Sequence, residues 1–405
     1  MGVTDNPTPQ GRSGLASHCA ATLDALRAQS LLRQMREVDS AQGTEILVGD
    51  RRLLNFSSND YLGLAGHPAI ADAARDAIAR FGSGSGASRL VCGNIAPHVA
   101  LEDAIARLKG TAAALAFSSG YAAALGTIPA LVGRGDTIIL DKLCHACLVD
   151  AARLSGAQIR VFRHNDVGQL EDHLRWATAR RGNTLVVVES VYSMDGDLAP
   201  LRGIVDAKDR HGAWLMVDEA HATGVFGPGG AGLARELGVA DRIDIQMATL
   251  SKALGTSGGF IAGSRELIDL LINRARSFIF STGPSPAAVA AARAAIDISA
   301  GAEGDALRTA LWANVNDLAA QLDGPWHEPP KGESPILPLI VGSEDRALAL
   351  ADALRGRGIW VPAIRYPTVA RGKARLRISL SAAHTPEQIT RLVDALRATA
   401  RHETS

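Results

Sequence analysis

The feature that most constrains the fold is a regular alternation of short apolar runs, rich in β-branched residues, with longer stretches of helical period. This alternation is typical of α/β domains, in which crossover helices connect parallel strands. The predicted strands are the short apolar runs at residues 136–140, 158–162, 184–189, 213–218, 244–249 and 259–262. Helical stretches such as 169–180 and 201–210 separate most of them. Because the runs are almost wholly apolar, we expect a mostly parallel central sheet with helices on both faces.

The end of the chain departs from this pattern. The segment between residues 249 and 259 is too short for a crossover helix, so the strands that flank it should be antiparallel. The later elements predict a small α+β domain, with helices at 287–300, 306–322, 345–357 and 386–400, strands at 335–341 and 375–381, and a proline-rich bend at 325–330. We therefore divide the chain into an N-terminal helical segment (1–50), a large domain (51–290) and a smaller C-terminal domain (291–405).

Charge and hydropathy argue against several classes of protein. The 405 residues carry 42 Lys and Arg against 42 Asp and Glu, so no overall cationic field would collect a nucleic acid. No run of about 18 apolar residues exists, so we expect no membrane span. The N-terminus is polar and lacks the apolar centre of a signal peptide. Four cysteines are too few for a disulfide framework, and we expect a cytoplasmic protein.

Lysine is scarce, and one copy stands at a strand end. The chain has lysines only at positions 109, 142, 208, 252, 331 and 373. Lys252 lies in ATLSKALGTSGG, after a predicted strand and before a glycine-rich turn, at the edge where open α/β sheets bind ligands. Its apolar neighbours Leu250, Ala253 and Leu254 favour a desolvated amine, which loses its proton readily and can form a Schiff base. A solvated surface lysine is the alternative.

Asp218-Glu219-Ala220-His221 stands at the end of the predicted strand at 213–218. Such a box binds magnesium in one group of nucleotide-driven helicases, whereas in pyridoxal-phosphate enzymes an aspartate pairs with the pyridine nitrogen. A phosphate-binding P-loop needs Gly-Lys followed by Ser or Thr. Only Lys373 follows a glycine closely, and Ala374 comes next. The sequence therefore favours pyridoxal phosphate, with its single phosphate and its aldehyde, over a nucleotide.

Glycine and hydroxyl residues supply candidate phosphate ligands. The SSGY turn at 118–121 opens a helical stretch whose first N–H groups would suit a dianion. Thr249 and the STG turn at 281–283 could add hydroxyl groups. The GSGSG loop at 82–86 lacks both the spacing of a dinucleotide fingerprint and a preceding strand, so we reject that interpretation.

The CHAC motif at 144–147 suggests zinc or redox chemistry at first sight. Zinc needs four ligands, and the chain has no second C-x-x-C pair, so Cys144 and Cys147 are expected to be small buried thiols. His145 follows a strand into a new helix and can reach the ligand-binding edge. A core histidine satisfied by the backbone is its alternative role.

These motifs together resemble the α-oxoamine synthases, which are pyridoxal-phosphate enzymes with the fold of aspartate aminotransferase. The resemblance runs from about residue 31 to about 396, and its motifs are NFSSNDYLGL (55–64), SSGYAAALG (118–126), CHACLVDAARLSGA (144–157), HNDV (164–167), VYSMDGDLAPL (191–201), LMVDEAHATGVFG (215–227) and TLSKALGTSGGF (249–260). The C-terminal motifs AIRYPTV (363–369) and SAAHT (381–385) are most similar to the branch of this family that serves biotin biosynthesis.

The resemblance implies a role for each matching residue. Lys252 would bind the cofactor covalently and act as a base, and Asp218 would face the pyridine nitrogen. His145 would stack on the ring and assist proton transfer, so these three are the catalytic residues that the resemblance implies. The other cofactor-binding residues that it implies are Gly120, Tyr121, Ser193, His221, Thr249, Ser281 and Thr282. The substrate-binding residues are His145 together with Arg33, Asn59, Thr368 and Arg377. Arg377 would pair with the amino-acid carboxylate, because a guanidinium offers two parallel donors.

The implied reaction condenses L-alanine with a pimeloyl thioester, carried by coenzyme A or an acyl carrier protein, to give 8-amino-7-oxononanoate, carbon dioxide and the free thiol. The resemblance also implies a homodimer, in which Ser281 and Thr282 reach into the partner's site. Glycine C-acetyl transfer, serine palmitoyl transfer and other α-oxoamine syntheses remain alternatives within the family. A nucleotide-driven ATPase and a purely structural protein are the alternatives from other classes.

Overall fold

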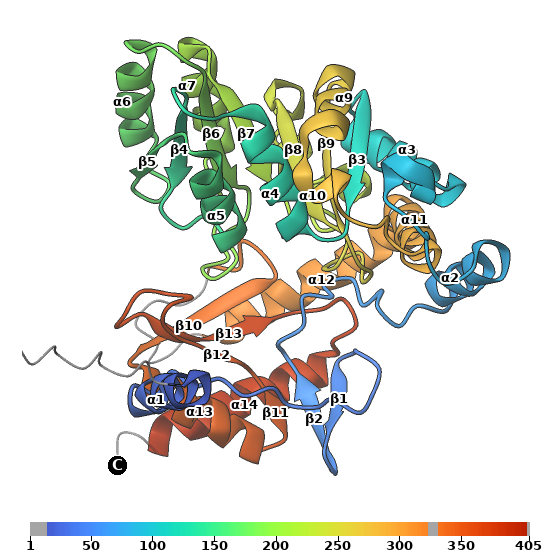
Figure 1. Ribbon diagram of the computed structural model, residues 1–405. Coiled ribbons are helices and arrows are strands. Elements are labelled where there is room, and N and C mark those ends of the chain that lie inside the picture. Colours follow the sequence, from blue (N-terminus) through green and yellow to red (C-terminus); the bar gives the residue numbers. More distant parts are fainter. Residues whose placement is uncertain (1–13, 323–330, 403–405) are drawn as a thin grey trace, which may run out of the picture.

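The computed structural model describes residues 14–322 and 331–402 and is built around a seven-stranded sheet (Figure 1). From one edge to the other, the strands are β3 (Ala113–Phe117), β9 (Gly259–Gly263), β8 (Ile245–Thr249), β7 (Trp214–Asp218), β6 (Thr184–Glu189), β4 (Thr137–Asp141) and β5 (Gln158–Phe162). All six strands predicted for this sheet are confirmed, and β3 is a seventh that was not predicted. The strands from β8 to β5 are parallel, and β9 is antiparallel to both of its neighbours, as the short connection predicted.

Helices cover both faces of this sheet, which confirms the α/β class. In β6, Leu185 and Val187 belong to one hydrophobic cluster and Val186 and Val188 to the other, because successive strand residues point to opposite faces. All four side chains are fully buried. The first face is covered by α4 (Gly120–Leu131), α5 (Ala146–Ser155), α9 (Arg265–Arg274) and α10 (Arg276–Ile279), and the second by α3 (Ala96–Lys109), α6 (Val167–Thr178) and α7 (Leu201–His211).

A smaller α+β region completes the molecule (Figure 1). Its antiparallel sheet has the order β10 (Ile336–Gly342), β13 (Ala374–Ser379), β12 (Ala363–Ile364). Its helices are α12 (Ala302–Gln321), α13 (Glu344–Gly356) and α14 (Pro386–His402). These elements confirm the two predicted strands and three of the four predicted helices, with ends shifted by a few residues. The fourth predicted helix, α11 (Pro286–Ala300), is present but packs mainly against α2 (Pro68–Phe81) and α3 of the large domain. The proline-rich bend expected at 325–330 lies outside the described residues.

The N-terminal part of the chain joins this smaller region. After helix α1 (Leu15–Ala28), strands β1 (Glu45–Val48) and β2 (Arg51–Asn55) form a hairpin, and β2 also pairs in parallel with β11 (Ile359–Trp360). The sequence did not predict this sheet, because its strands are short and its pairing joins residues about 300 positions apart.

The remaining helical elements are α2 (Pro68–Phe81), η1 (Arg89–Gly93), η2 (Pro228–Gly230), α8 (Leu233–Glu236), η3 (Ala240–Arg242) and α11 (Pro286–Ala300). Among the described helices, none combines the length and the apolar character needed to cross a bilayer.

The smaller region contacts the large sheet at the carboxyl ends of its parallel strands, since Arg377 and Arg375 on β13 bind the loop that follows β6. This contact places two domains around the edge where the candidate site residues gather.

Candidate active site

Four central strands end in a buried polar residue at the same edge of the sheet. These residues are Asp141 on β4, Glu189 on β6, Asp218 on β7 and Thr249 on β8. Glu189 and Asp218 are direct neighbours in the strand register. Burial raises the pKa of Asp218, although the nearby Lys252 acts against this shift. Burial and the charge of Asp218 likewise raise the pKa of Glu189 well above its usual range. The edge therefore gathers carboxyl groups whose ionised forms are stabilised by the neighbouring Lys252.

Lys252 provides that cation and begins a chain of buried polar groups. Its Nζ lies 2.7 Å from Nε2 of His221, and Nδ1 of His221 lies 2.7 Å from the hydroxyl of Tyr61. Burial lowers the pKa of Lys252 to about 8, although Asp218 and Glu189 partly oppose this shift. A substantial fraction of this amine is therefore neutral near physiological pH, which a nucleophile or base requires.

His221 is held neutral by its surroundings. Its ring is buried, and burial lowers its pKa well below the usual range, with the charges of Lys252 and Arg377 acting in the same direction. Both ring nitrogens have a partner, so the ring orientation is determined from two sides. A neutral imidazole here can accept or donate a hydrogen bond without adding charge to the site.

Arg377 carries the chain of contacts into the smaller domain. Its Nε donates to the carbonyl of Ser193 at 2.7 Å, and its Nη1 donates to Oδ1 of Asn59 at 3.1 Å and to Oγ of Ser379 at 2.7 Å. Its Nη2 lies 3.5 Å from the hydroxyl of Tyr61. The structure therefore brings the predicted residues Asn59, Ser193 and Arg377 together with Lys252 and His221.

Tyr61 and Glu189 were missed by the sequence analysis. Tyr61 is fully buried and links His221 to Arg377, and its place in the NDYLGL motif was the available signal. Glu189 accepts the backbone N–H of His145 at 2.5 Å, and its position as the last residue of an apolar strand could have identified it. Both residues support groups that the sequence did predict.

His145 caps helix α5 beside these acids. Its Nδ1 accepts the N–H of Cys147 at 3.2 Å, which fixes the ring at the start of the helix. The side chain is exposed, yet desolvation by neighbouring protein atoms lowers its pKa, with Asp218 raising it and Lys252 lowering it.

Cys144 and Cys147 are buried free thiols, as predicted, and burial raises the pKa of both. In the described residues, no group of three or more His, Cys, Asp or Glu could hold a metal ion.

The start of helix α4 forms a backbone cradle beside Thr249. A Cβ added to Gly120, the first residue of α4, would lie 3.6 Å from Cβ of Thr249. A Cβ added to Gly259 on β9 would lie only 2.4 Å from the Gly120 nitrogen, so only glycine fits at this position of the strand. Free N–H groups at a helix start, with a hydroxyl alongside, suit a phosphate dianion. The neighbouring Tyr121 is exposed and donates its hydroxyl to Asp150.

Four predicted residues lie apart from this cluster. Ser281 and Thr282 follow α10, and Thr282 pairs with Ser88 next to the glycine-rich loop. Arg33 donates from Nη2 to the hydroxyl of Thr368 at 3.0 Å, and both side chains are exposed. Across residues 14–322 and 331–402, no hydrogen bond joins any of these four to Lys252, Asp218 or Thr249.

A cavity of about 670 Å³ opens at the amino-terminal ends of β7 and β8, opposite the candidate site. It is lined by residues such as Trp214 and Asp244 and includes none of the predicted site residues.

The geometry fits pyridoxal phosphate. The aldehyde needs an amine that is partly neutral, which Lys252 supplies, and the pyridinium needs a buried carboxylate, which Asp218 supplies. The phosphate needs N–H groups and a hydroxyl. Helix α4 begins at Gly120 with backbone N–H groups, and Thr249 lies beside it, with its hydroxyl donating to the carbonyl of Gly258 at 2.8 Å and lying 2.8 Å from Oγ of Ser251. The buried imidazole of His221 lies in hydrogen-bond contact with the lysine, where a phenolic oxygen would need a partner.

Comparison with known proteins agrees with this fit. The family model for class I and II aminotransferases matches residues 51–396. The 8-amino-7-oxononanoate synthase of Anaeromyxobacter dehalogenans (strain 2CP-1) is 50% identical over 385 residues, which cover 95% of this chain and 96% of the relative. Among solved structures, a serine palmitoyltransferase from S. paucimobilis with a bound PLP-myriocin aldimine aligns with a TM-score of 0.90 at 31% identity, covering 96% of this chain and 99% of the other.

The 8-amino-7-oxononanoate synthase of Francisella tularensis aligns with a TM-score of 0.74 at 26% identity, covering 87% of this chain and 99% of the other. The expected large pyridoxal-phosphate domain with a smaller C-terminal domain is therefore confirmed. The chain belongs to the class I and II aminotransferase family and, within it, to the pyridoxal-phosphate-dependent α-oxoamine synthases.

Proposed function

We propose that this enzyme condenses L-alanine with a pimeloyl thioester and releases carbon dioxide and the thiol carrier, giving 8-amino-7-oxononanoate for biotin biosynthesis. The observation that carries this proposal is the 50% identity to an 8-amino-7-oxononanoate synthase over 95% of the chain. The solved serine palmitoyltransferase aligns with a TM-score of 0.90, against 0.74 for the 8-amino-7-oxononanoate synthase of Francisella tularensis. Its identity of 31% is, however, well below the 50% shared with the Anaeromyxobacter synthase, so the sequence favours the biotin branch.

Pyridoxal phosphate, when bound, supplies an electron sink that stabilises negative charge on the substrate Cα. Lys252 would bind its aldehyde and, once displaced by the substrate amine, take and return a proton at the substrate Cα. An amine with a pKa of about 8 is suited to both transfers near neutral pH. Asp218 would keep a proton on the pyridine nitrogen. His221, held by Tyr61, would orient the phenolic oxygen together with Ser193, whose backbone carbonyl accepts from Nε of Arg377 at 2.7 Å.

Arg377 would bind the amino-acid carboxylate together with Asn59, because its guanidinium is buried and already aligned by that side chain. His145 would cover the ring face and contact substrate. Gly120, Tyr121 and Thr249 would hold the phosphate side. Arg33 and Thr368 are hydrogen-bonded to each other and would meet the acyl donor.

We further propose a cytoplasmic homodimer in which Ser281 and Thr282 complete the partner's phosphate site. In the described part of one chain, Thr282 bridges to Ser88 beside the glycine-rich loop and makes no hydrogen bond to Lys252, which supports a role across an interface. The free thiols of all four cysteines suit a reducing compartment. Sedimentation of the holoenzyme should give about twice the chain mass of 42.3 kDa, and a monomer that is fully active would contradict the shared site.

The activity test uses purified holoenzyme. Borohydride reduction and peptide mapping should place the cofactor on Lys252, and Lys252→Ala should lose the covalent bond. L-alanine with pimeloyl-CoA or with pimeloyl carrier protein should release carbon dioxide faster than glycine with acetyl-CoA or serine with palmitoyl-CoA. The comparison of the two pimeloyl donors identifies the carrier. Preference for glycine and acetyl-CoA would instead assign a glycine C-acetyltransferase, and a cofactor bound elsewhere would refute the site.

A further inference from the structure

The loop between β6 and α7 joins the two domains at the edge of the candidate site. We call residues 191–198 the bridging loop. It closes on itself, because the N–H of Tyr192 donates to the carbonyl of Asp197 at 3.1 Å and the N–H of Gly196 donates to the carbonyl of Tyr192 at 2.8 Å. Its backbone carbonyl at Ser193 is the group that binds Nε of Arg377. The position of this loop therefore affects the position of the guanidinium.

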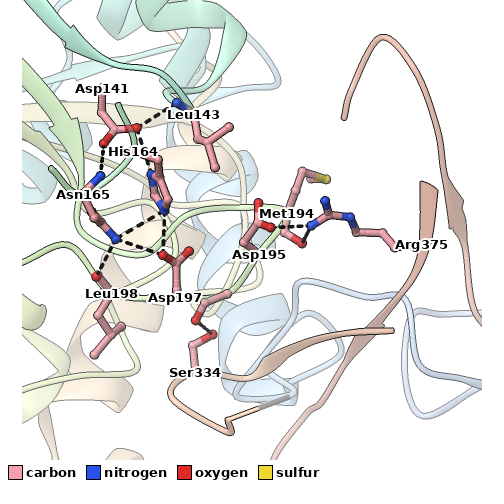
Figure 2. A network of polar contacts seen from close by, with 11 residues as sticks. Asp141, Leu143, His164, Asn165, Met194, Asp195, Asp197, Leu198, Ser334 and Arg375 are labelled. Carbon is pink, nitrogen blue, oxygen red and sulfur yellow. Dashed lines mark hydrogen bonds and ion pairs between the residues drawn. The ribbon is translucent and has the colours of Figure 1, made fainter. Parts of the chain in front are cut away.

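On the large-domain side, the bridging loop is held by His164, which follows β5 (Figure 2). Nε2 of His164 lies 2.7 Å from Oδ2 of Asp197 in the loop, and Nδ1 lies 3.0 Å from Oδ1 of Asp141 at the end of β4. The Asp141 side chain is completely buried. Asn165 strengthens this contact, since its side-chain amide donates to Oδ2 of Asp197 at 2.9 Å and to the carbonyl of Leu198 at 3.1 Å.

On the small-domain side, Figure 2 shows a second set of contacts with the same loop. Nη1 of Arg375 lies 2.6 Å from Oδ1 of Asp195 and donates to the carbonyl of Met194 at 3.1 Å. The hydroxyl of Ser334 donates to the carbonyl of Gly196 at 2.7 Å. The bridging loop is thus held from both domains, at residues 197 and 198 by the large domain and at residues 194–196 by the small domain.

The geometry around His164 favours a cation. The side-chain amide nitrogen of Asn165 also lies 3.3 Å from Nε2 of His164, but its shorter contacts are with Oδ2 of Asp197 and the carbonyl of Leu198. A neutral imidazole has one N–H and can donate to only one carboxylate, whereas an imidazolium donates to both. Both ring nitrogens of His164 face a carboxylate oxygen within 3.0 Å. Burial by itself lowers the pKa of His164, but the hydrogen bonds to Asp141 and Asp197 outweigh it and raise the pKa to about 10. The edge of the Tyr192 ring packs against the imidazole, with ring centroids 4.3 Å apart, and limits its rotation.

We propose that His164 is a positioning residue: as a cation between Asp141 and Asp197 it fixes the bridging loop, and the loop holds Arg377 in place for the substrate carboxylate. This inference rests on the proposed function, because it takes the amino-acid carboxylate as the ligand of Arg377. It adds to that function a residue that touches neither cofactor nor substrate. A histidine that only stabilised the fold would affect all ligands of the site alike.

The test compares His164→Gln with wild type and with His67→Gln, using holoenzyme. His67 forms a similar pair, 3.0 Å from Glu303, outside the bridging loop, and its side chain is 21% exposed against 24% for His164. Absorbance titrations would use L-alanine and L-alaninamide, which has the same shape without the carboxylate. We expect His164→Gln to raise the apparent Kd for L-alanine about tenfold. This factor corresponds to the loss of one charged hydrogen bond, here between Arg377 and the substrate carboxylate. The Kd for L-alaninamide should change less than about twofold. His67→Gln should change neither value.

A second variant and a second measurement guard against a folding defect in His164→Gln. Asp197→Asn removes one charge from a partly exposed side chain and should give the same selective loss. In the cofactor-free protein, amide hydrogen exchange in the peptide covering the bridging loop should be faster in both variants than in wild type and in His67→Gln.

An equal loss of affinity for the two ligands, or an L-alanine Kd that neither variant changes, would overturn the inference while the proposed function stood. If wild-type enzyme gave no response to L-alanine, the proposed function would fail first and this inference with it.

Discussion

The buried ion pair between Lys109 and Glu219 offers a quantitative test of how the site is supported. Both side chains are completely buried, and Nζ of Lys109 lies 2.5 Å from Oε2 of Glu219 and 2.6 Å from the carbonyl of Ala231. Oε1 of Glu219 accepts the N–H of Ala234 at 2.9 Å. Glu219 directly follows Asp218, so the pair ties the segment after β7 to the end of α3. Lys109→Met would leave the Glu219 carboxylate buried without its cation.

The expected loss is large because breaking a buried pair leaves an uncompensated charge. Removing one partner of such a pair typically costs about 3–5 kcal/mol in free energy of unfolding. For a domain of this size, each kcal/mol shifts the melting temperature by about 2–4 °C, so we expect a decrease of roughly 10 °C. In the double variant Lys109→Met with Glu219→Gln no charge remains, and at least half of the loss, about 2 kcal/mol, should return.

The assay is thermal denaturation of the cofactor-free variants, followed by circular dichroism at one scan rate. Lys208→Met is the matched control, because Lys208 pairs with Asp244 at 3.1 Å, but that carboxylate is 40% exposed and stays solvated when the lysine is lost. It should cost about 1 kcal/mol or less. A melting temperature of Lys109→Met close to that of Lys208→Met, or a double variant less stable than Lys109→Met, would refute the reasoning.

Three further predictions concern backbone packing and titration. Gly259→Ala should weaken cofactor binding at least about tenfold, because its Cβ would displace the nitrogen of Gly120 at the phosphate cradle, whereas Gly356→Ala, whose Cβ meets nothing within 4 Å, should bind cofactor normally in fluorescence titrations. In the cofactor-free protein, acetylation of Lys252 followed by mass spectrometry should show a rate midpoint near pH 8, and a midpoint near the value of a free lysine would contradict its desolvation. The raised pKa of His164 means that its contribution to stability is fully present below the unfolded value of about 6.5 and is lost as the pH rises toward 10. The destabilisation caused by His164→Gln in urea unfolding should therefore be larger at pH 6.5 than at pH 10, and an equal effect at both would argue against a charged imidazole.

Local patterns in the sequence predicted six of the seven strands of the large sheet and two of the polar residues at their ends, whereas β3 and the role of Glu189 were not predicted. The six strands predicted for the large sheet are present, because strands buried on both faces need continuous apolar runs whatever their neighbours are. Asp218 and Thr249 close two such runs, and Lys252 follows one of them, so their common edge was predictable from parallel topology alone. The scarcity of lysine and the missing P-loop then favoured pyridoxal phosphate before any contact was known.

Contacts between distant segments could not be predicted in this way. The sheet formed by β1, β2 and β11, and the bonds from Tyr61 to His221 and from Arg377 to Ser193, join residues that no local period relates. The charge of His164 likewise depends on two carboxylates that only the fold brings to its ring nitrogens. Hydrophobic period and turn chemistry act over a few residues, and they determined the elements and their polar ends. Hydrogen bonds and burial act over a few ångströms between any parts of the chain. Only the tertiary structure therefore decided which groups are charged and which side chains hold them in place.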